Sequence, residues 1–157
     1  MTSETIILGI AGFLHNLFTV IWIGGLVMIV ITVLPAAKKS LENNKQVQQL
    51  MYGVLKRHRV WVYISIIGLL ITGIIQARIA PSFSGLMKFD SSYSSLVSIK
   101  HILTIMMIGI TLYRSIVFGK KGMNITPQQS NFSLKLVFVN ASIGILILLA
   151  SAFLAVV

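Results

Sequence analysis

Long apolar segments alternate with short polar ones along the whole 157-residue chain. Four stretches are apolar almost without interruption, at about 6–34, 60–80, 96–118 and 132–157. Each reaches the roughly 20 residues that an α-helix needs to cross the hydrocarbon core of a bilayer. Because these stretches occupy most of the chain, we predict an all-α membrane protein. It should form a single domain over 1–157, an up-down bundle of four transmembrane helices.

Patterns beside the apolar stretches predict where two of the helices begin. Apolar residues between positions 47 and 55 are spaced i, i+3, i+4, i+7 and i+8, which predicts an amphipathic extension leading into the second span. Thr126, Pro127 and Gln129 have the order of an N-cap, a first-turn proline and an N3 residue, so the fourth helix should begin before its apolar part. The serine-rich segment 81–95 is expected to be a loop.

Composition excludes most soluble classes of protein. The chain is 56% hydrophobic and 10% charged, whereas soluble domains carry roughly 25% charged residues. The net charge of +10 could suggest nucleic-acid binding, but that requires a basic surface on a soluble domain, which this chain is not expected to form. We therefore expect the lipid bilayer as partner and no nucleic acid. The chain has no Cys, which excludes disulfides and thiolate metal sites. The only acids, Glu4, Glu42 and Asp90, lie outside the spans, so acid/base catalysis by paired carboxylates is excluded. An enzyme is therefore not the favoured class, and any chemistry would belong to a bound metal or cofactor.

The uneven distribution of Lys and Arg predicts the orientation. Both the first and the third connection are rich in these residues, whereas the N-terminus, the C-terminus and the second connection have few charges. Cytoplasmic loops of membrane proteins carry the excess of Lys and Arg. We therefore expect a multi-pass protein of the plasma membrane with both termini outside.

Two histidines are the candidate metal ligands. His15 and His101 both enter the membrane from the predicted outer side and should lie at similar depth. In an up-down bundle the first and third helices are diagonal, so inward-facing imidazoles could meet across the core. Such a pair could bind copper or act as the axial ligands of haem b. The alternative is that each histidine is hydrogen-bonded to a Ser, a Thr or a carbonyl of a neighbouring helix.

Other polar and aromatic residues extend this candidate site. Trp22 lies seven residues after His15 and is expected to form an aromatic wall on the same helical face. Arg78, Lys88 and Lys100 lie toward the outer side, where they could bind acidic groups of a cofactor such as haem propionates, or lipid phosphates.

The stripe Tyr93, Lys100, Met107 and Arg114 recurs every seventh residue on a face of the third helix different from that of His101. Lys100 and Arg114 could snorkel to the outer and inner interfaces respectively. His58, in a basic run at the inner boundary, is interpreted as an interfacial residue.

The segment from His15 to Pro35, HNLFTVIWIGGLVMIVITVLP, resembles the first-helix signature of the copper-resistance D (CopD) family, a His followed by Trp-x-Gly-Gly-Leu. Leu70–Ile74 is similar to the Thr-Gly turn of that family, and Tyr93, Leu96, Lys100 and Arg114 continue the resemblance in the third helix. The resemblance implies a membrane protein of copper uptake or homeostasis. His15, Trp22, Lys100 and His101 are the matched positions that would serve it.

A looser resemblance is to HemJ-type protoporphyrinogen oxidases, small haem-associated membrane proteins, through His15, Trp22 and Lys100. Three functions therefore stay open at this point. The chain could bind or conduct copper near the outer face, could be a b-type haem redox protein, or could be an accessory subunit of a larger membrane oxidase or monooxygenase. Copper passage through so small a bundle would need a homo-oligomer or a partner subunit.

Overall fold

The computed structural model describes residues 2–79, 89–121 and 124–156. Within these ranges every regular element is helical. Four helical spans are long and apolar enough to cross a membrane: Ser3–Ser40, Asn44–Ile79, Ser92–Val117 and Pro127–Leu154. The predicted all-α protein with four transmembrane helices is thus confirmed.

The first span is not a uniform α-helix. It consists of α1 (Ser3–Thr19), the π-helical segment η1 (Val20–Gly24), α2 (Gly25–Met28), a second π-helical segment η2 (Ile29–Val33) and α3 (Leu34–Ser40). Pro35 is the second residue of α3, and proline cannot donate the i→i−4 hydrogen bond and crowds the carbonyl of the preceding turn. A wider turn before Pro35 accommodates this without breaking the helix.

The other spans are single helices that extend past their apolar parts. The second is α4 (Asn44–Ile79), whose first two turns contain the buried Val47 and Met51 of the predicted amphipathic extension. The fourth is α6 (Pro127–Leu154), where Thr126 and Gln129 form the expected capping box. The helices therefore extend beyond the apolar stretches at 6, 34, 60 and 132, because apolarity marks the membrane core and not the helix ends.

The third span, α5 (Ser92–Val117), begins inside the segment expected to be a loop. Ser91 and Ser94 form a capping box, in which each side chain bonds to the backbone N–H of the other. The serines of 91–94 therefore start a helix, and the loop prediction was wrong for 92–95.

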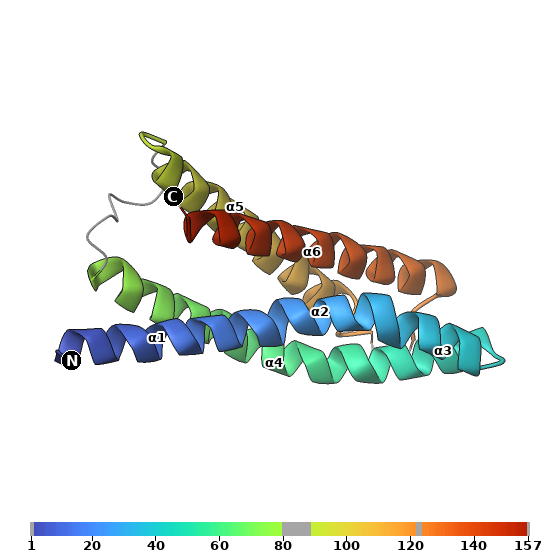
Figure 1. Cartoon of the computed structure of the whole chain (residues 1–157). Helices are drawn as coiled ribbons and strands as arrows, with labels where there is room; N and C mark the ends of the chain where they lie inside the picture. Colours follow the sequence, from blue (N-terminus) through green and yellow to red (C-terminus); the bar gives the residue numbers. More distant parts are fainter. Residues whose placement is uncertain (1, 80–88, 122–123, 157) are drawn as a thin grey trace.

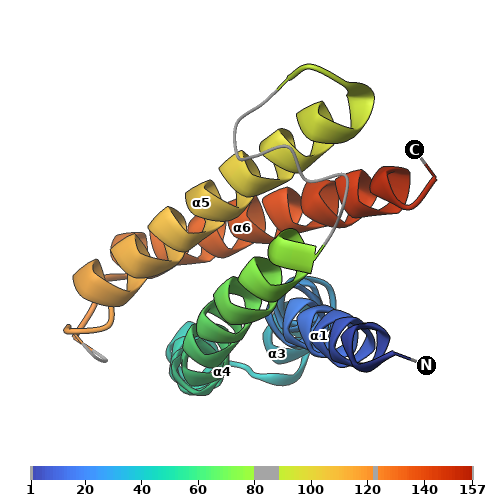
Figure 2. The same ribbon diagram turned by 90° about the vertical axis from the view of Figure 1, so that its left-hand side faces the viewer.

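The helices are arranged as two antiparallel pairs (Figure 1). α1 packs chiefly on α4, and α5 on α6, while η1 and α2 contact α6. Figures 1 and 2 show both chain ends at one end of the bundle, which we call the terminal end. The α3–α4 and α5–α6 connections lie at the opposite end, which we call the basic end because it carries most of the Lys and Arg. The two pairs diverge toward the terminal end in Figure 1.

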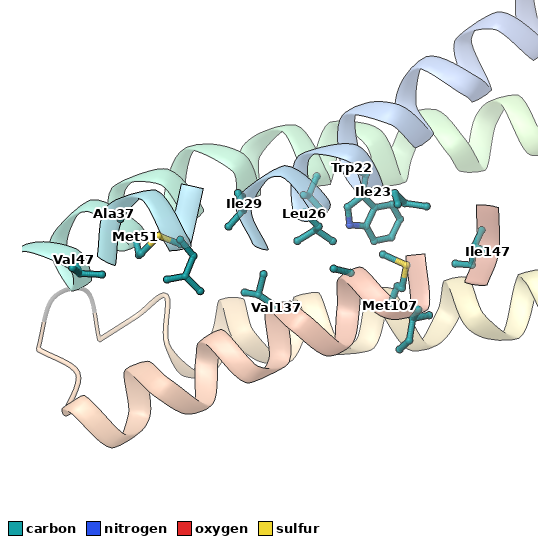
Figure 3. Close-up of a cluster of buried hydrophobic side chains, with 14 residues drawn as sticks. Trp22, Ile23, Leu26, Ile29, Ala37, Val47, Met51, Met107, Val137 and Ile147 are labelled. Carbon is teal, nitrogen blue, oxygen red and sulfur yellow. The ribbon is translucent and has the colours of Figure 1, made fainter. Parts of the chain in front are cut away.

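A buried apolar cluster joins the two pairs. Figure 3 shows Trp22, Leu26 and Ile29 pointing from the first span toward Val137 and Met107 on α6 and α5. Met107, from the stripe on the third span, is fully buried in this cluster. The cluster extends from the middle of the bundle to the basic end, where Ala37, Val47 and Met51 lie (Figure 3).

Small and polar residues bring the helices together, as their positions in the sequence suggest. Gly68 faces the Phe18 ring and Gly144 faces Ile23, and a Cβ on either glycine would collide with these side chains. Such close approaches are typical of helix packing in membranes. The buried Asn140 donates to Thr111 Oγ1 at 3.0 Å and so links α6 to α5.

Candidate functional site

The half-buried His15 is hydrogen-bonded across the α1–α4 pair. Its Nδ1 lies 2.9 Å from Thr72 Oγ1, and the buried Thr72 hydroxyl donates to the Gly68 carbonyl at 2.7 Å. With its one hydrogen in the bond to Gly68, that hydroxyl accepts from His15, and Nδ1 of a neutral ring then carries the proton. Nε2 then keeps its lone pair and is the atom able to bind a metal.

His101 has the same protonation for a different reason. Its Nδ1 lies 2.7 Å from the Val97 carbonyl, one turn earlier in α5. A carbonyl only accepts, so Nδ1 is the donor, and Nε2 is the nitrogen that carries the lone pair when the ring is neutral. A backbone or side-chain acceptor on one ring nitrogen is the usual support of a metal-binding histidine.

The two histidines differ in their surroundings. His15 lies on the α4-facing side of α1, whereas His101 is exposed on α5. Both Lys100 and His101 lie within electrostatic range of the His15 imidazole. The alternative interpretation, a histidine hydrogen-bonded to a Ser, a Thr or a carbonyl of a neighbouring helix, describes His15, whereas His101 bonds to the Val97 carbonyl of its own helix.

The donor set fits copper in part. The described residues contain no group of three or more His, Asp or Glu side chains that could hold a metal ion. A metal at the terminal end would therefore have two imidazole ligands at most from side chains of this kind. Imidazole suits copper, and Cu(I) tolerates low coordination numbers. The residues thus fit a loosely coordinated copper ion better than a closed structural metal site.

Trp22 does not belong with His15. Its indole is 2% exposed and lies within the apolar cluster of Figure 3, and it lines a cavity near the basic end. Its expected place beside His15 assumed α-helical spacing, but η1 begins at Val20. A π turn takes about one extra residue, so Trp22 is rotated away from the face that α-helical spacing predicts.

The remaining predicted site residues lie apart from one another. Arg78 is exposed in the last turn of α4, which suits contact with lipid headgroups. Lys88 lies outside the described residues. Lys100 is half-buried, on the same stripe of α5 as the fully buried Met107.

His58 was interpreted from the sequence as an interfacial residue, and its packing against the first span was not predicted. Its ring packs against Gly25, the second glycine of the Trp-x-Gly-Gly-Leu segment, so closely that a Cβ on this glycine would overlap it. Its Nε2 is buried and has no hydrogen-bond partner within the described part of the chain. The glycine pair was the available signal, because a glycine in the middle of a helix commonly marks a close approach.

No family model, curated protein or solved structure matches this chain. The structure itself defines the class, a multi-pass protein with four apolar helices of membrane-spanning length.

Proposed function

We propose that the protein binds a copper ion at the terminal end of the bundle, with Nε2 of His15 and Nε2 of His101 as ligands. The observation that supports this most is the hydrogen bonding of both Nδ1 atoms, to Thr72 and to the Val97 carbonyl. In neutral rings this arrangement leaves one lone pair on α1 and one on α5 to bind a metal.

The apolar cluster supports binding rather than conduction by a single chain. Trp22, Leu26 and Met107 are almost fully buried between the terminal end and the basic end. A copper ion that left its ligands and entered this apolar cluster would be neither coordinated nor hydrated, which is energetically costly. Passage of copper across the membrane therefore requires a second copy of the chain or a larger membrane complex.

We further propose that the terminal end faces the outside of the plasma membrane. The basic end contains the two connections rich in Lys and Arg, and the positive-inside rule places such connections in the cytoplasm. The copper site would then receive its ion from outside the cell.

A b-type haem is the second candidate, and Lys100 favours it. This half-buried side chain acts electrostatically on His15, and its positive charge would repel a copper cation but attract a haem propionate. The two imidazoles would be the axial ligands, and Lys100 would hold the acidic edge of the macrocycle.

Metal analysis and an optical spectrum of natively purified protein distinguish the two. Bound copper without a Soret band supports the copper site, and a Soret band lost in the H15A/H101A variant supports haem. If the natively purified protein has neither copper nor haem, and does not take up copper when it is supplied, both proposals are wrong.

A further inference from the structure

A second polar site lies at the basic end, against the apolar cluster, whose Trp22 and Leu26 also line it. A cavity of about 80 Å³ opens there between the first span, α4, α5 and the start of α6. Its polar wall includes Arg59, Arg114, His58 and the hydroxyls of Ser115 and Ser133. This volume holds more than a single water molecule and is large enough for a small anionic group.

Hydrogen bonds orient the polar side chains of this wall. Arg59 Nη1 donates to Ser115 Oγ at 3.3 Å, and the Tyr63 hydroxyl donates to the same oxygen at 2.6 Å. Arg114 Nε is 3.4 Å from Ser133 Oγ on α6. Because both serine oxygens accept, their own hydrogens are available to a ligand, as are the other N–H groups of each guanidinium.

The positive charge of the wall is not balanced by the protein. Arg114 lies within electrostatic range of both Arg59 and His58. The only acids of the chain are Glu4, Glu42 and Asp90, all exposed. None of them forms an ion pair with a cation in the described ranges, and none lines the cavity. Half-buried cations held side by side without a counter-ion are unfavourable, so the wall is incomplete without an anion.

Two buried nitrogens at the same cavity also have no hydrogen-bond partner in the described part of the chain. The Trp22 indole, 2% exposed, lines the cavity, and its Nε1–H is unpaired. His58 Nε2 is unpaired in the same way. Buried polar groups nearly always have a partner, so these nitrogens indicate a group that the chain does not supply.

We propose that this cavity binds a phosphate group between Arg59 and Arg114. A phosphate offers several strong acceptor oxygens, which matches the number of converging donors, and arginine pairs with it in a bidentate manner. The group is either the headgroup phosphate of a phospholipid, whose depth at the predicted inner interface suits the site, or a small phosphorylated solute. This site does not depend on the proposed copper site.

The test uses the full chain in detergent, with two arms that distinguish the sources. In the first, thermal unfolding of delipidated protein is followed with inorganic phosphate and with chloride at equal ionic strength. Phosphate at a hundredfold excess over its Kd should raise the unfolding temperature by about 5–10 °C more than chloride. In the second, native mass spectrometry measures the phospholipid that remains bound after gentle purification.

R114Q removes the central cation, and R57Q is its matched control. Arg57 is exposed on α4, two residues before Arg59, and does not line the cavity. R114Q should abolish the phosphate-specific shift or the retained phospholipid, whereas R57Q should keep it. If R114Q does not fold, S115A carries the comparison and should weaken phosphate binding about tenfold.

A shift with inorganic phosphate identifies a soluble ligand, and a retained phospholipid that phosphate does not replace identifies the lipid. The proposal is overturned if phosphate and chloride act alike and phospholipid retention is the same in R114Q and R57Q. Copper binding by R114Q should equal that of the wild type. If the phosphate proposal is overturned, the copper proposal for the terminal end is therefore unaffected.

Discussion

Removal of the Thr72 hydroxyl group is the most informative single substitution for the proposed copper site. In T72V the shape of this 3% exposed side chain is kept, but His15 Nδ1 loses its acceptor at 2.9 Å. The imidazole can then rotate or move its proton to Nε2, which destroys the ligand lone pair. Loss of such supporting hydrogen bonds typically costs 10- to 100-fold in metal affinity, which is about 1.4–2.8 kcal/mol.

The assay is competition for Cu(I) between the purified protein and a chromophoric chelator under reducing conditions. T104V is the matched control, because the Thr104 hydroxyl donates only to the Lys100 carbonyl of its own helix. T72V should weaken copper binding at least tenfold and T104V less than twofold. Equal affinities of wild type, T72V and T104V would refute the role given to the His15–Thr72 bond.

Three further predictions concern charge, packing and orientation. K100Q should strengthen copper binding about tenfold, because it removes a positive charge that repels the ion. Two unit charges ~10 Å apart interact by roughly 1.7 kcal/mol at an effective dielectric of 20. Weaker copper binding by K100Q would instead favour an anionic cofactor. G25V should lower the free energy of unfolding by about 1–3 kcal/mol relative to G53V, because a side chain at Gly25 collides with the neighbouring imidazole whereas Gly53 faces open space; equal unfolding temperatures would contradict this. In the natural cysteine-free background, N43C should react with an impermeant thiol reagent only after cell lysis and D90C in intact cells; the reverse result would invert the orientation.

The number of spans and several helix ends follow from local chemistry, which is why they could be predicted. Apolar length alone indicates membrane helices. Thr126 and Gln129 cap α6 through bonds within one turn, so their spacing was sufficient. The serines at 91–94 have the same capping chemistry, but a high serine content resembles that of a loop and concealed the start of α5.

Side-chain direction was harder to predict, because it depends on the exact turn of the helix. α-Helical spacing predicted that Trp22 lies on the same face as His15, and the π-helical turns of η1 change that spacing. His101 was expected to face the core, but it is exposed, and its neighbour Lys100 is the half-buried residue.

The basic-end cavity could not be predicted from the sequence, because its residues meet only in the folded chain. Arg59 and Arg114 come from different helices, and only the packing of α4 against α5 through Ser115 brings them to one wall. The scarcity of acids in the sequence was a signal that these cations lack protein partners, but it does not say where they meet.

The copper content of natively purified protein tests the central claim most directly. Wild-type protein and the H15A/H101A variant should be purified side by side, with elemental analysis and an absorption spectrum of each. We expect about one tightly bound copper per wild-type chain, no Soret band, and loss of the copper in the variant. Equal copper in both proteins, or none in either after copper is supplied, would contradict the proposed site.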